Sequence, residues 1–243
     1  MVQFSQVFLK DTRYIEKIVL ALTEDMSLLT FVEVGPGEGV ITRELLKRGA
    51  TVYAIEVDLR LVDKLKKDLE LKLVMNRRFF IYHADFLKFD MGNLPSPIRF
   101  FSNLPYAITS EAIHRVISYR DMFHDVHLLL QKEVVDKLLS ESTYLSLWTR
   151  YHFEIERLFN VPRTAFHPIP KVHSSFIRMK PKKRLLNEQG EKILKRILKQ
   201  AFKNRRKKLK NALTGFKIPQ EMSEKRAEEL RLEDFIRIAE VNR

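Results

Sequence analysis

The chain has 243 residues and a net charge of +13, and 45% of its residues are hydrophobic. This length accommodates one sizeable α/β domain and a small second one. The sequence contains no cysteine, which excludes disulfides, thiolate metal sites and catalysis through a thiol. It shows no signal peptide, and no apolar run approaches the roughly 20 residues of a membrane span. We therefore expect a cytoplasmic protein without a membrane partner.

The positive charge is concentrated in the last quarter of the chain. Residues 1–180 carry a net charge of +3, whereas residues 181–243 carry +10. This polarised excess favours a nucleic-acid partner over a merely solvated, lysine-rich surface. We predict two domains, 1–180 and 181–243, of which the second binds the nucleic acid.

Short apolar runs alternate with helical patterns in the first domain. A helix capped by Asp11 begins the series. Strands are predicted at 31–34, 51–55, 79–83, 98–102 and 126–130, with helices at 40–48 and 59–71. This alternation predicts a parallel, doubly wound sheet. Two later runs, 153–159 and 174–179, have no long helix between them and suggest an antiparallel addition at the sheet edge.

The second domain reads as purely helical. Apolar residues from Ile193 to Leu213 form one stripe opposite a basic face, and a second helical piece runs from Ser223 to about Val241. The basic face is expected to bind phosphates, although a solvated surface or a targeting cluster is the alternative. Its candidate RNA-binding residues are Lys203, Arg205, Arg206, Lys207, Lys208 and Lys210.

A glycine-rich segment follows the first predicted strand. It reads Glu33-Val34-Gly35-Pro36-Gly37-Glu38-Gly39, and glycines there let the backbone approach a ligand at the carboxyl end of a strand. The spacing is GxGxG, whereas the dinucleotide fingerprint is GxGxxG. This difference favours a nucleoside ligand at Gly35 and Gly37 over a pyrophosphate. A tight strand–helix turn without a ligand is the alternative.

Acidic residues close the next two predicted strands. Glu56 ends the second, about 20 residues after the glycines, where its carboxylate can accept the ribose hydroxyls. Asp85 follows the third and can accept from an adenine amino group, while Val57 can pack on the adenine face. Each acid alone is better explained as a surface charge or a helix cap. Their succession along the strand ends nevertheless predicts a nucleoside site.

The tetrapeptide Asn103-Leu104-Pro105-Tyr106 follows the fourth predicted strand. It suits methylation of an exocyclic amino group, whose lone pair is delocalised into the ring. The Asn103 side-chain oxygen and the Leu104 carbonyl can accept the two N–H groups and direct that lone pair. Pro105 fixes the backbone, and Tyr106 can stack on the base. A turn capping the helix near Thr109 is the structural alternative.

These segments resemble the rRNA adenine N6-dimethyltransferases, the KsgA/Erm family. The motifs EVGPGEG, IEVD, HADFLKFD and NLPYAITS occur in the family's order and spacing. The resemblance continues through 131–134, 161–172 and 202–213, and therefore covers nearly the whole chain. The segment RRKKLKNAL is most similar to the small-subunit branch, KsgA, rather than to the Erm branch.

The resemblance implies a fold, a cofactor and a substrate. The fold is an α/β, Rossmann-like, seven-stranded class I methyltransferase domain followed by a small all-α domain. The cofactor is S-adenosylmethionine. The substrate is 16S rRNA in a precursor of the 30S subunit, where two adjacent adenosines of a hairpin loop near the 3′ end are each dimethylated at N6. A role in small-subunit biogenesis follows, and we expect a monomer.

Further site residues are implied by the resemblance alone. Phe166 matches the aromatic residue that closes over the target base opposite Tyr106; without the family, a core phenylalanine would be the better interpretation. The set of expected cofactor contacts comprises Gln6, Val7, Leu9, Gly35, Gly37, Glu56, Val57, Asp85, Phe86 and Asn103. Val7 stands where the family has a polar residue, which leaves its backbone as the contact. The seven histidines lack ligand spacing, so we predict no metal site.

Three other functions are compatible with parts of this pattern. An Erm-type enzyme would methylate 23S rRNA by the same chemistry. A methyltransferase-fold protein could serve only as an RNA-binding assembly factor, although the intact NLPY motif argues against lost chemistry. A nicotinamide dehydrogenase is disfavoured by the GxGxG spacing.

Overall fold

The computed structural model describes residues 7–25, 27–68, 78–104 and 106–243, without the side chain of Tyr106. Its strands are β1 (Phe8–Leu9), β2 (Thr30–Val34), β3 (Thr51–Glu56), β4 (Phe79–His83), β5 (Ile98–Asn103), β6 (Phe123–Gln131), β7 (Phe153–Val161), β8 (Phe166–His167) and β9 (Ser174–Pro181). Its helices are α1 (Thr12–Leu22), α2 (Val40–Lys47), α3 (Leu59–Lys67), α5 (Thr109–Ser118), α6 (Lys132–Leu139), α7 (Tyr144–His152), α8 (Glu188–Lys203), α9 (Leu209–Ala212), α10 (Gln220–Ser223) and α11 (Leu232–Glu240).

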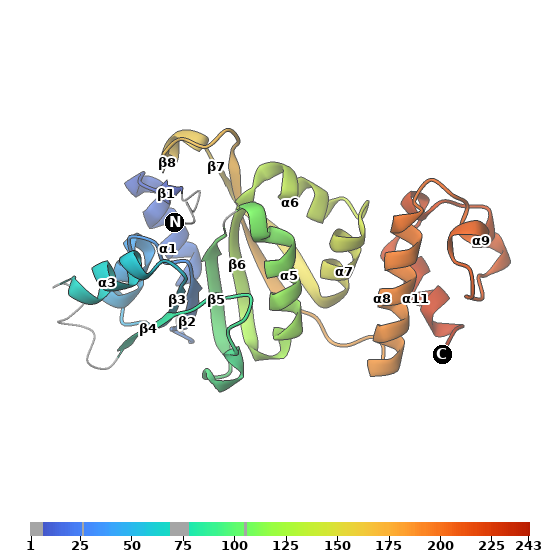
Figure 1. The fold of residues 1–243 in the computed structure, drawn as a ribbon, viewed down its shortest axis with the longest axis horizontal. Coiled ribbons are helices and arrows are strands. Elements are labelled where there is room, and N and C mark those ends of the chain that lie inside the picture. Colours follow the sequence, from blue (N-terminus) through green and yellow to red (C-terminus); the bar gives the residue numbers. More distant parts are fainter. Residues whose placement is uncertain (1–6, 26, 69–77, 105) are drawn as a thin grey trace. The chain divides into compact units, whose positions relative to one another are not determined.

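Seven strands form one sheet in the order β4-β3-β2-β5-β6-β9-β7 (Figure 1). Strand β2 runs parallel to β3 and β5, and the parallel pairing continues to β4 on one side and to β6 on the other. Strand β9 is antiparallel to β6. The predicted parallel sheet with an antiparallel addition is therefore confirmed. Strands β1 and β8 pair with each other outside this sheet.

Strands β2 to β6 and helices α1 to α3 overlap the ranges that the apolar pattern predicts. The central strand β5 is buried along five of its six residues, and such continuous burial is typical of a parallel strand covered on both faces. Helix α1 begins at Thr12 and is capped by Asp11, whose carboxylate accepts the backbone N–H of Arg13. Its apolar face packs with α2 and with β2, β3 and β5 in one hydrophobic cluster. Helix α3 ends at Lys67, and residues 69–71 of its predicted range lie outside the described residues.

The chain forms two compact units. The first comprises 1–135 and 156–181, and the second comprises 136–155 and 182–243. This grouping differs from the predicted division at residue 180 because 136–155 joins the carboxyl-terminal helices. Within the second unit, the Tyr151 hydroxyl accepts the Leu186 N–H at 3.0 Å, and the Lys195 ammonium lies over the Trp148 ring. These long-range contacts leave no periodic signal in the sequence.

Two helical predictions in the second unit are wrong. The stretch from Ser223 to Val241 is not one helix, because α10 ends at Ser223 and α11 begins only at Leu232. Carboxylates interrupt it: Glu229 accepts the Arg226 N–H and Asp234 accepts the Arg231 N–H. Each carboxylate accepts the backbone N–H of the residue three positions before it, which is the arrangement found at the start of a helix. No helix in the described ranges is both long and apolar enough to cross a membrane.

The basic residues from Lys203 to Lys210 do not lie on the face of one helix either. Helix α8 ends at Lys203, Asn204 caps it, and 204–207 form a turn before α9. Five cations within 203–208 would repel one another along a continuous helix, whereas cations beside a helix carboxyl terminus are favourable. We name residues 203–210 the basic turn.

Candidate active site

Four parallel strands end at the same edge of the sheet, where the glycine segment and the NLPY motif begin. The register pairs Val34 of β2 with Ile55 of β3 and with Ser102 of β5. Glu56 pairs with His83 of β4. The residues that follow these strands are therefore neighbours. In open α/β sheets this edge is where ligands bind.

The glycine turn leaves open space at Gly35 and closes tightly at Gly37. Both residues have positive φ, +67° at Gly35 and +59° at Gly37, which favours glycine. A Cβ at Gly37 would lie 3.0 Å from the Phe8 ring, whereas a Cβ at Gly35 would meet no atom within 4 Å. A ligand can thus approach the backbone at Gly35, which fits the cofactor that the resemblance implies.

Glu56 is a buried carboxylate held by backbone N–H groups. Its Oε1 accepts from Val57 at 2.9 Å and from Asp58 at 3.0 Å, and its Oε2 accepts from Gly37 at 3.3 Å. Burial raises the pKa of Glu56, and these three bonds partly oppose that effect. A carboxylate has about four acceptor positions. Oε2 therefore keeps one position for a ligand hydroxyl, so Glu56 fits the ribose of S-adenosylmethionine.

Of the predicted cofactor contacts beside Glu56 and after β4, Val57 and Asp85 leave groups available to a ligand, whereas the Phe86 side chain belongs to the core. Val57 is 42% exposed, which leaves an apolar face available to an adenine. Asp85 accepts the Leu87 N–H through Oδ1, so it caps a turn and retains Oδ2. The Phe86 ring is buried and lies 5.6 Å from that of Phe100. Only the backbone of Phe86 remains for the expected cofactor contact.

The Asn103 side chain connects the end of β5 to the amino-terminal segment. Its Nδ2 donates to the Val7 carbonyl at 3.4 Å, so Oδ1 is oriented as the remaining acceptor. The preceding residue of β5 is Ser102. Its Oγ donates to the Val34 carbonyl at 2.7 Å and joins β5 to the start of the glycine turn. The Leu104 side chain is buried, so Leu104 could serve the target amine only through its carbonyl, as predicted.

Phe166 lies in the core near this edge. It is 3% exposed, pairs with Leu9 across the β1–β8 ladder, and belongs to the cluster that contains α1 and α2. Leu9 is buried in the same cluster. Both residues support the amino-terminal segment, and a contact between Phe166 and a target base stays a prediction. Gln6 and Pro105 lie outside the described residues, as does the Tyr106 side chain.

Sequence reasoning gave no role to Glu33, the buried acid that precedes the glycine turn. Thr42 Oγ1 donates to Glu33 Oε2 at 2.7 Å. Burial raises the pKa of Glu33 to about 7, and the nearby Glu56 carboxylate adds to that increase. An acidic residue within an otherwise apolar strand was the available signal. Glu33 thus links β2 to α2 directly below the ligand edge.

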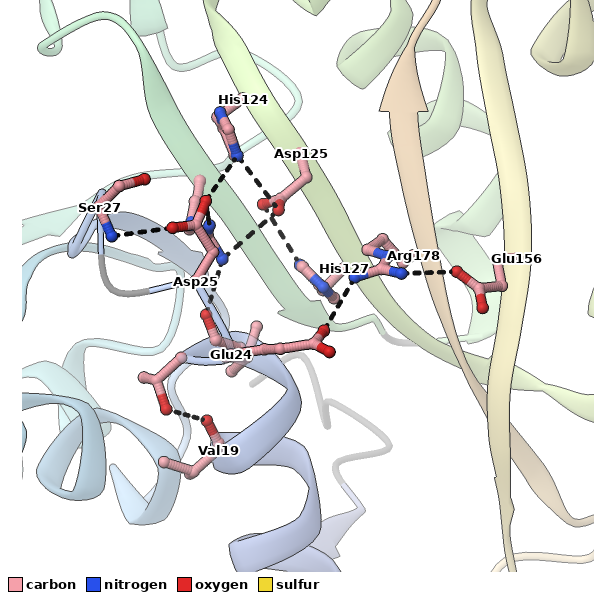
Figure 2. Close-up of polar contacts among 12 residues, drawn as sticks. Val19, Glu24, Asp25, Ser27, His124, Asp125, His127, Glu156 and Arg178 are labelled. Atoms are coloured by element: carbon pink, nitrogen blue, oxygen red, sulfur yellow. Dashed lines mark hydrogen bonds and ion pairs between the residues drawn. The ribbon is translucent and has the colours of Figure 1, made fainter.

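Sequence reasoning also missed a charged network at the opposite end of the strands (Figure 2). Arg99 is 2% exposed; it donates to the Leu22 carbonyl at 2.9 Å and to Asp25 at 3.1 Å. Asp125 lies 3.4 Å from Arg99 and 3.5 Å from His127. His127 is fully buried, and its pKa is lowered to about 3, first by burial and then by the positive charge of Arg99. The network joins α1 to β5 and β6, away from the ligand edge.

The six candidate RNA-binding residues of the basic turn are all exposed. Lys208 and Lys210 both form ion pairs with Glu224, the former at 2.6 Å. These cations lower the pKa of Glu224 to about 2. The turn thus presents a cluster of cations on the second unit, of which two are already paired with a carboxylate.

Comparison with known proteins identifies the family. The model of the ribosomal RNA adenine dimethylase family matches residues 2–242. A ribosomal RNA small subunit methyltransferase A from Nitrosospira multiformis is 37% identical and covers 88% of this chain and 83% of its own. A protein of the same name from Pseudomonas aeruginosa is 35% identical and covers 98% and 92%.

Solved structures show the same fold. A dimethyladenosine transferase from Plasmodium falciparum superposes with a TM-score of 0.79 at 23% identity and covers 95% of each chain. The 23S rRNA methyltransferase ErmE superposes with a TM-score of 0.75 at 25% identity and covers 97% of this chain and all of its own. The class I methyltransferase fold is therefore confirmed. Because the family model spans nearly every residue, the chain belongs to the ribosomal RNA adenine dimethylases, which are S-adenosylmethionine-dependent enzymes.

Proposed function

We propose that this enzyme dimethylates the N6 amino groups of two adjacent adenosines in a hairpin loop near the 3′ end of 16S rRNA, in a precursor of the 30S subunit. The relatives from Nitrosospira multiformis and Pseudomonas aeruginosa, both named for the small subunit, support this substrate. The proposal includes a role in small-subunit biogenesis. It also retains the expected cytoplasmic location and the expected monomer.

The orientation of Asn103 is the observation that carries the proposal. Its Nδ2 bond to the Val7 carbonyl leaves Oδ1 to accept an N–H group of the target amine. The backbone carbonyl of Leu104 can accept the second N–H. Together they hold the nitrogen with its lone pair free for attack, in place of a general base. When bound, S-adenosylmethionine supplies a methyl group attached to a positively charged sulfur.

The proposed substrate is tested by methyl transfer to purified subunits. Small subunits that lack the modification should accept tritiated methyl groups, and nucleoside analysis should identify N6,N6-dimethyladenosine. Transfer to large subunits instead would favour the 23S rRNA alternative, for which the likeness to ErmE provides a specific reason. Binding of small subunits without any transfer would favour an assembly factor.

The proposed role of Asn103 is tested by the N103A variant. Its transfer rate should fall by at least about 100-fold, as when one preorganised polar group is removed from an active site. Its affinity for S-adenosylhomocysteine should fall much less, by no more than about tenfold, because Asn103 is only one of the expected cofactor contacts. The exposed Asn93 provides the control N93A, which should retain the wild-type rate. Wild-type turnover by N103A would refute the role.

A further inference from the structure

A loop next to the proposed site carries an exposed apolar residue on a firmly held stem. We call residues 163–173 the proline loop. The Arg163 N–H donates to His173 Nδ1 at 3.3 Å and joins the two ends of the loop. The His173 carbonyl accepts the Lys132 N–H at 2.9 Å, and the Ala165 carbonyl accepts the Lys10 N–H at 2.8 Å. The stem is therefore bonded to two other segments of the first unit.

Ile169 in this loop is 59% exposed, and we call it the tip of the loop. Single exposed apolar residues are common on protein surfaces. Ile169 differs because Pro168 and Pro170 flank it and fix the φ angles on both sides, and because Pro170 is buried. The isoleucine side chain is itself stiff, since it is branched at Cβ. The loop thus presents a rigid apolar tip to solvent.

The surroundings of the tip suit an RNA. No Asp or Glu occurs between Arg157 and Asn187 in the sequence. Within the proline loop, Arg163 and Lys171 are exposed cations on either side of Ile169. Cations of this kind bind phosphates, which position a nucleic acid without reading its bases. The charge around Ile169 therefore complements an RNA backbone.

The tip is also close to the proposed target site. His167 pairs with Phe8, whose ring packs against Gly37 of the glycine turn. The preceding residue, Val7, accepts the bond from Asn103. Ile169 is two residues beyond His167, which places it within about 7 Å of chain length from this ladder. An RNA loop whose adenine reached Asn103 would thus pass the proline loop.

From this arrangement we propose that Ile169 is a positioning residue that enters the base stack of the target RNA and helps to extrude the adenosine to be methylated. The inference rests on the proposed function. Apolar side chains, isoleucine and proline among them, are used as wedges between stacked bases. An enzyme that modifies a base must first remove it from the stack. Ile169 fills the gap in the stack, while Arg163 and Lys171 hold the flanking phosphates.

The test compares I169A and I169L with the matched control L20A. Leu20 has a similar exposure, 55%, on α1 of the same compact unit. Single-turnover transfer to unmodified small subunits should be about 10- to 100-fold slower for I169A. Its affinities for the subunit and for S-adenosylhomocysteine should stay within about threefold of wild type. I169L, which keeps an apolar wedge, and L20A should both remain near the wild-type rate.

A second substrate separates extrusion from a general structural role. Small subunits with a mismatch at the base pair that closes the target hairpin already have weakened stacking, so they should restore much of the I169A rate. Equal rates for I169A and wild type, a loss only in subunit affinity, or no rescue by the mismatch would overturn the wedge alone. Absence of dimethyladenosine with the wild-type enzyme would overturn the proposed function and the wedge with it.

Discussion

At the scale of single residues, burial of the Glu33 carboxyl group lowers the free energy of unfolding by an amount that depends on pH. Its pKa is about 7 in the fold because it is buried, against an ordinary value of 4.5. Between these values the folded protein keeps a proton that the unfolded chain has lost, so stability falls as pH rises through this window. Above pH 7 the cost reaches at most about 3 kcal/mol.

We expect E33Q to remove this cost, because the glutamine stays neutral and its amide oxygen can still accept from Thr42. The variant should gain up to about 3 kcal/mol over wild type at pH 8 and little at pH 4.5. Urea unfolding followed by circular dichroism measures the difference; fluorescence would report Trp148, which lies in the other unit. E16Q, at an exposed position of α1, is the control. An equal gain at both pH values would contradict the assignment.

Glu56 should control affinity for the cofactor. In E56Q the amide cannot accept all the bonds that the carboxylate makes to Val57, Asp58 and Gly37. Hydrogen bonds to charged groups contribute about 1.5–3 kcal/mol, so S-adenosylhomocysteine should bind roughly 10- to 100-fold more weakly. Calorimetric titration measures this change. E38Q, at an acid of the same turn that pairs with Lys10 and Lys64, should bind nearly as wild type; equal losses would refute the role of Glu56.

The site residues differ in how far sequence could predict them. The sequence could place Gly35, Glu56 and Asn103 near one another because each lies at or just after the end of an apolar strand, and parallel strands bring their ends together. Arg99 and His127 were not, because Arg99 donates to the Leu22 carbonyl and His127 stacks on Phe176, and both of these partners are distant in the chain. Family resemblance assigned Phe166 to the target base, whereas its burial is equally that of a core residue.

At the scale of elements, strands were predicted better than helix ends. A parallel strand is marked in the sequence by a short apolar run, and β3 and β4 match their predicted ranges to within one residue. Helix ends depend on bonds that periodicity does not record. Helix α8 ends at Lys203 although the apolar stripe continues to Leu213, and α11 begins where Asp234 accepts the Arg231 N–H.

The basic turn between α8 and α9 should contribute to RNA affinity through charge alone. Arg205, Arg206 and Lys207 are exposed there. If all three contact phosphates, replacing them with alanine should reduce the slope of log affinity against log salt by about 2–3. Binding of S-adenosylhomocysteine should not change, because the site lies in the other unit.

Filter binding of small subunits over a series of salt concentrations measures that slope. The control removes three exposed lysines of the first unit, Lys47, Lys66 and Lys67, and thereby changes the net charge equally. A similar decrease in both triple variants would show that the net charge, rather than the basic turn, determines the affinity.

At the scale of the whole molecule, charge and chemistry are divided between the two compact units. The sheet unit holds the glycine turn, Glu56 and Asn103, whereas the helical unit holds the basic turn. The uneven charge along the sequence indicated a separate basic domain at 181–243. It did not predict that 136–155 joins the helical unit, because the contacts of Trp148 and Tyr151 with 182–243 are long-range.

Glu33 and His127, on either side of Phe101 in the sheet, should oppose each other in the pH dependence of folding. His127 has a folded pKa of about 3 against an ordinary 6.5. As pH falls from 6.5, His127 becomes protonated in the unfolded chain but stays neutral in the folded protein, so the free energy of unfolding decreases. Glu33 has the opposite slope between pH 4.5 and 7. Between about pH 4.5 and 6.5 the two contributions cancel, each changing by roughly 1.4 kcal/mol per pH unit.

Replacing either Glu33 or His127 should therefore reveal the change of stability with pH that the other residue causes. In H127F the new ring keeps the stacking on Phe176, and stability relative to wild type should rise as pH falls from 6.5 to 4.5. In E33Q the relative stability should rise as pH increases over the same range. Because β5 separates β2 from β6, the sites are about 10 Å apart, and the double variant should return to the wild-type profile. Urea unfolding at five pH values measures all four proteins; parallel profiles for H127F and wild type would show that His127 is not held neutral in the fold.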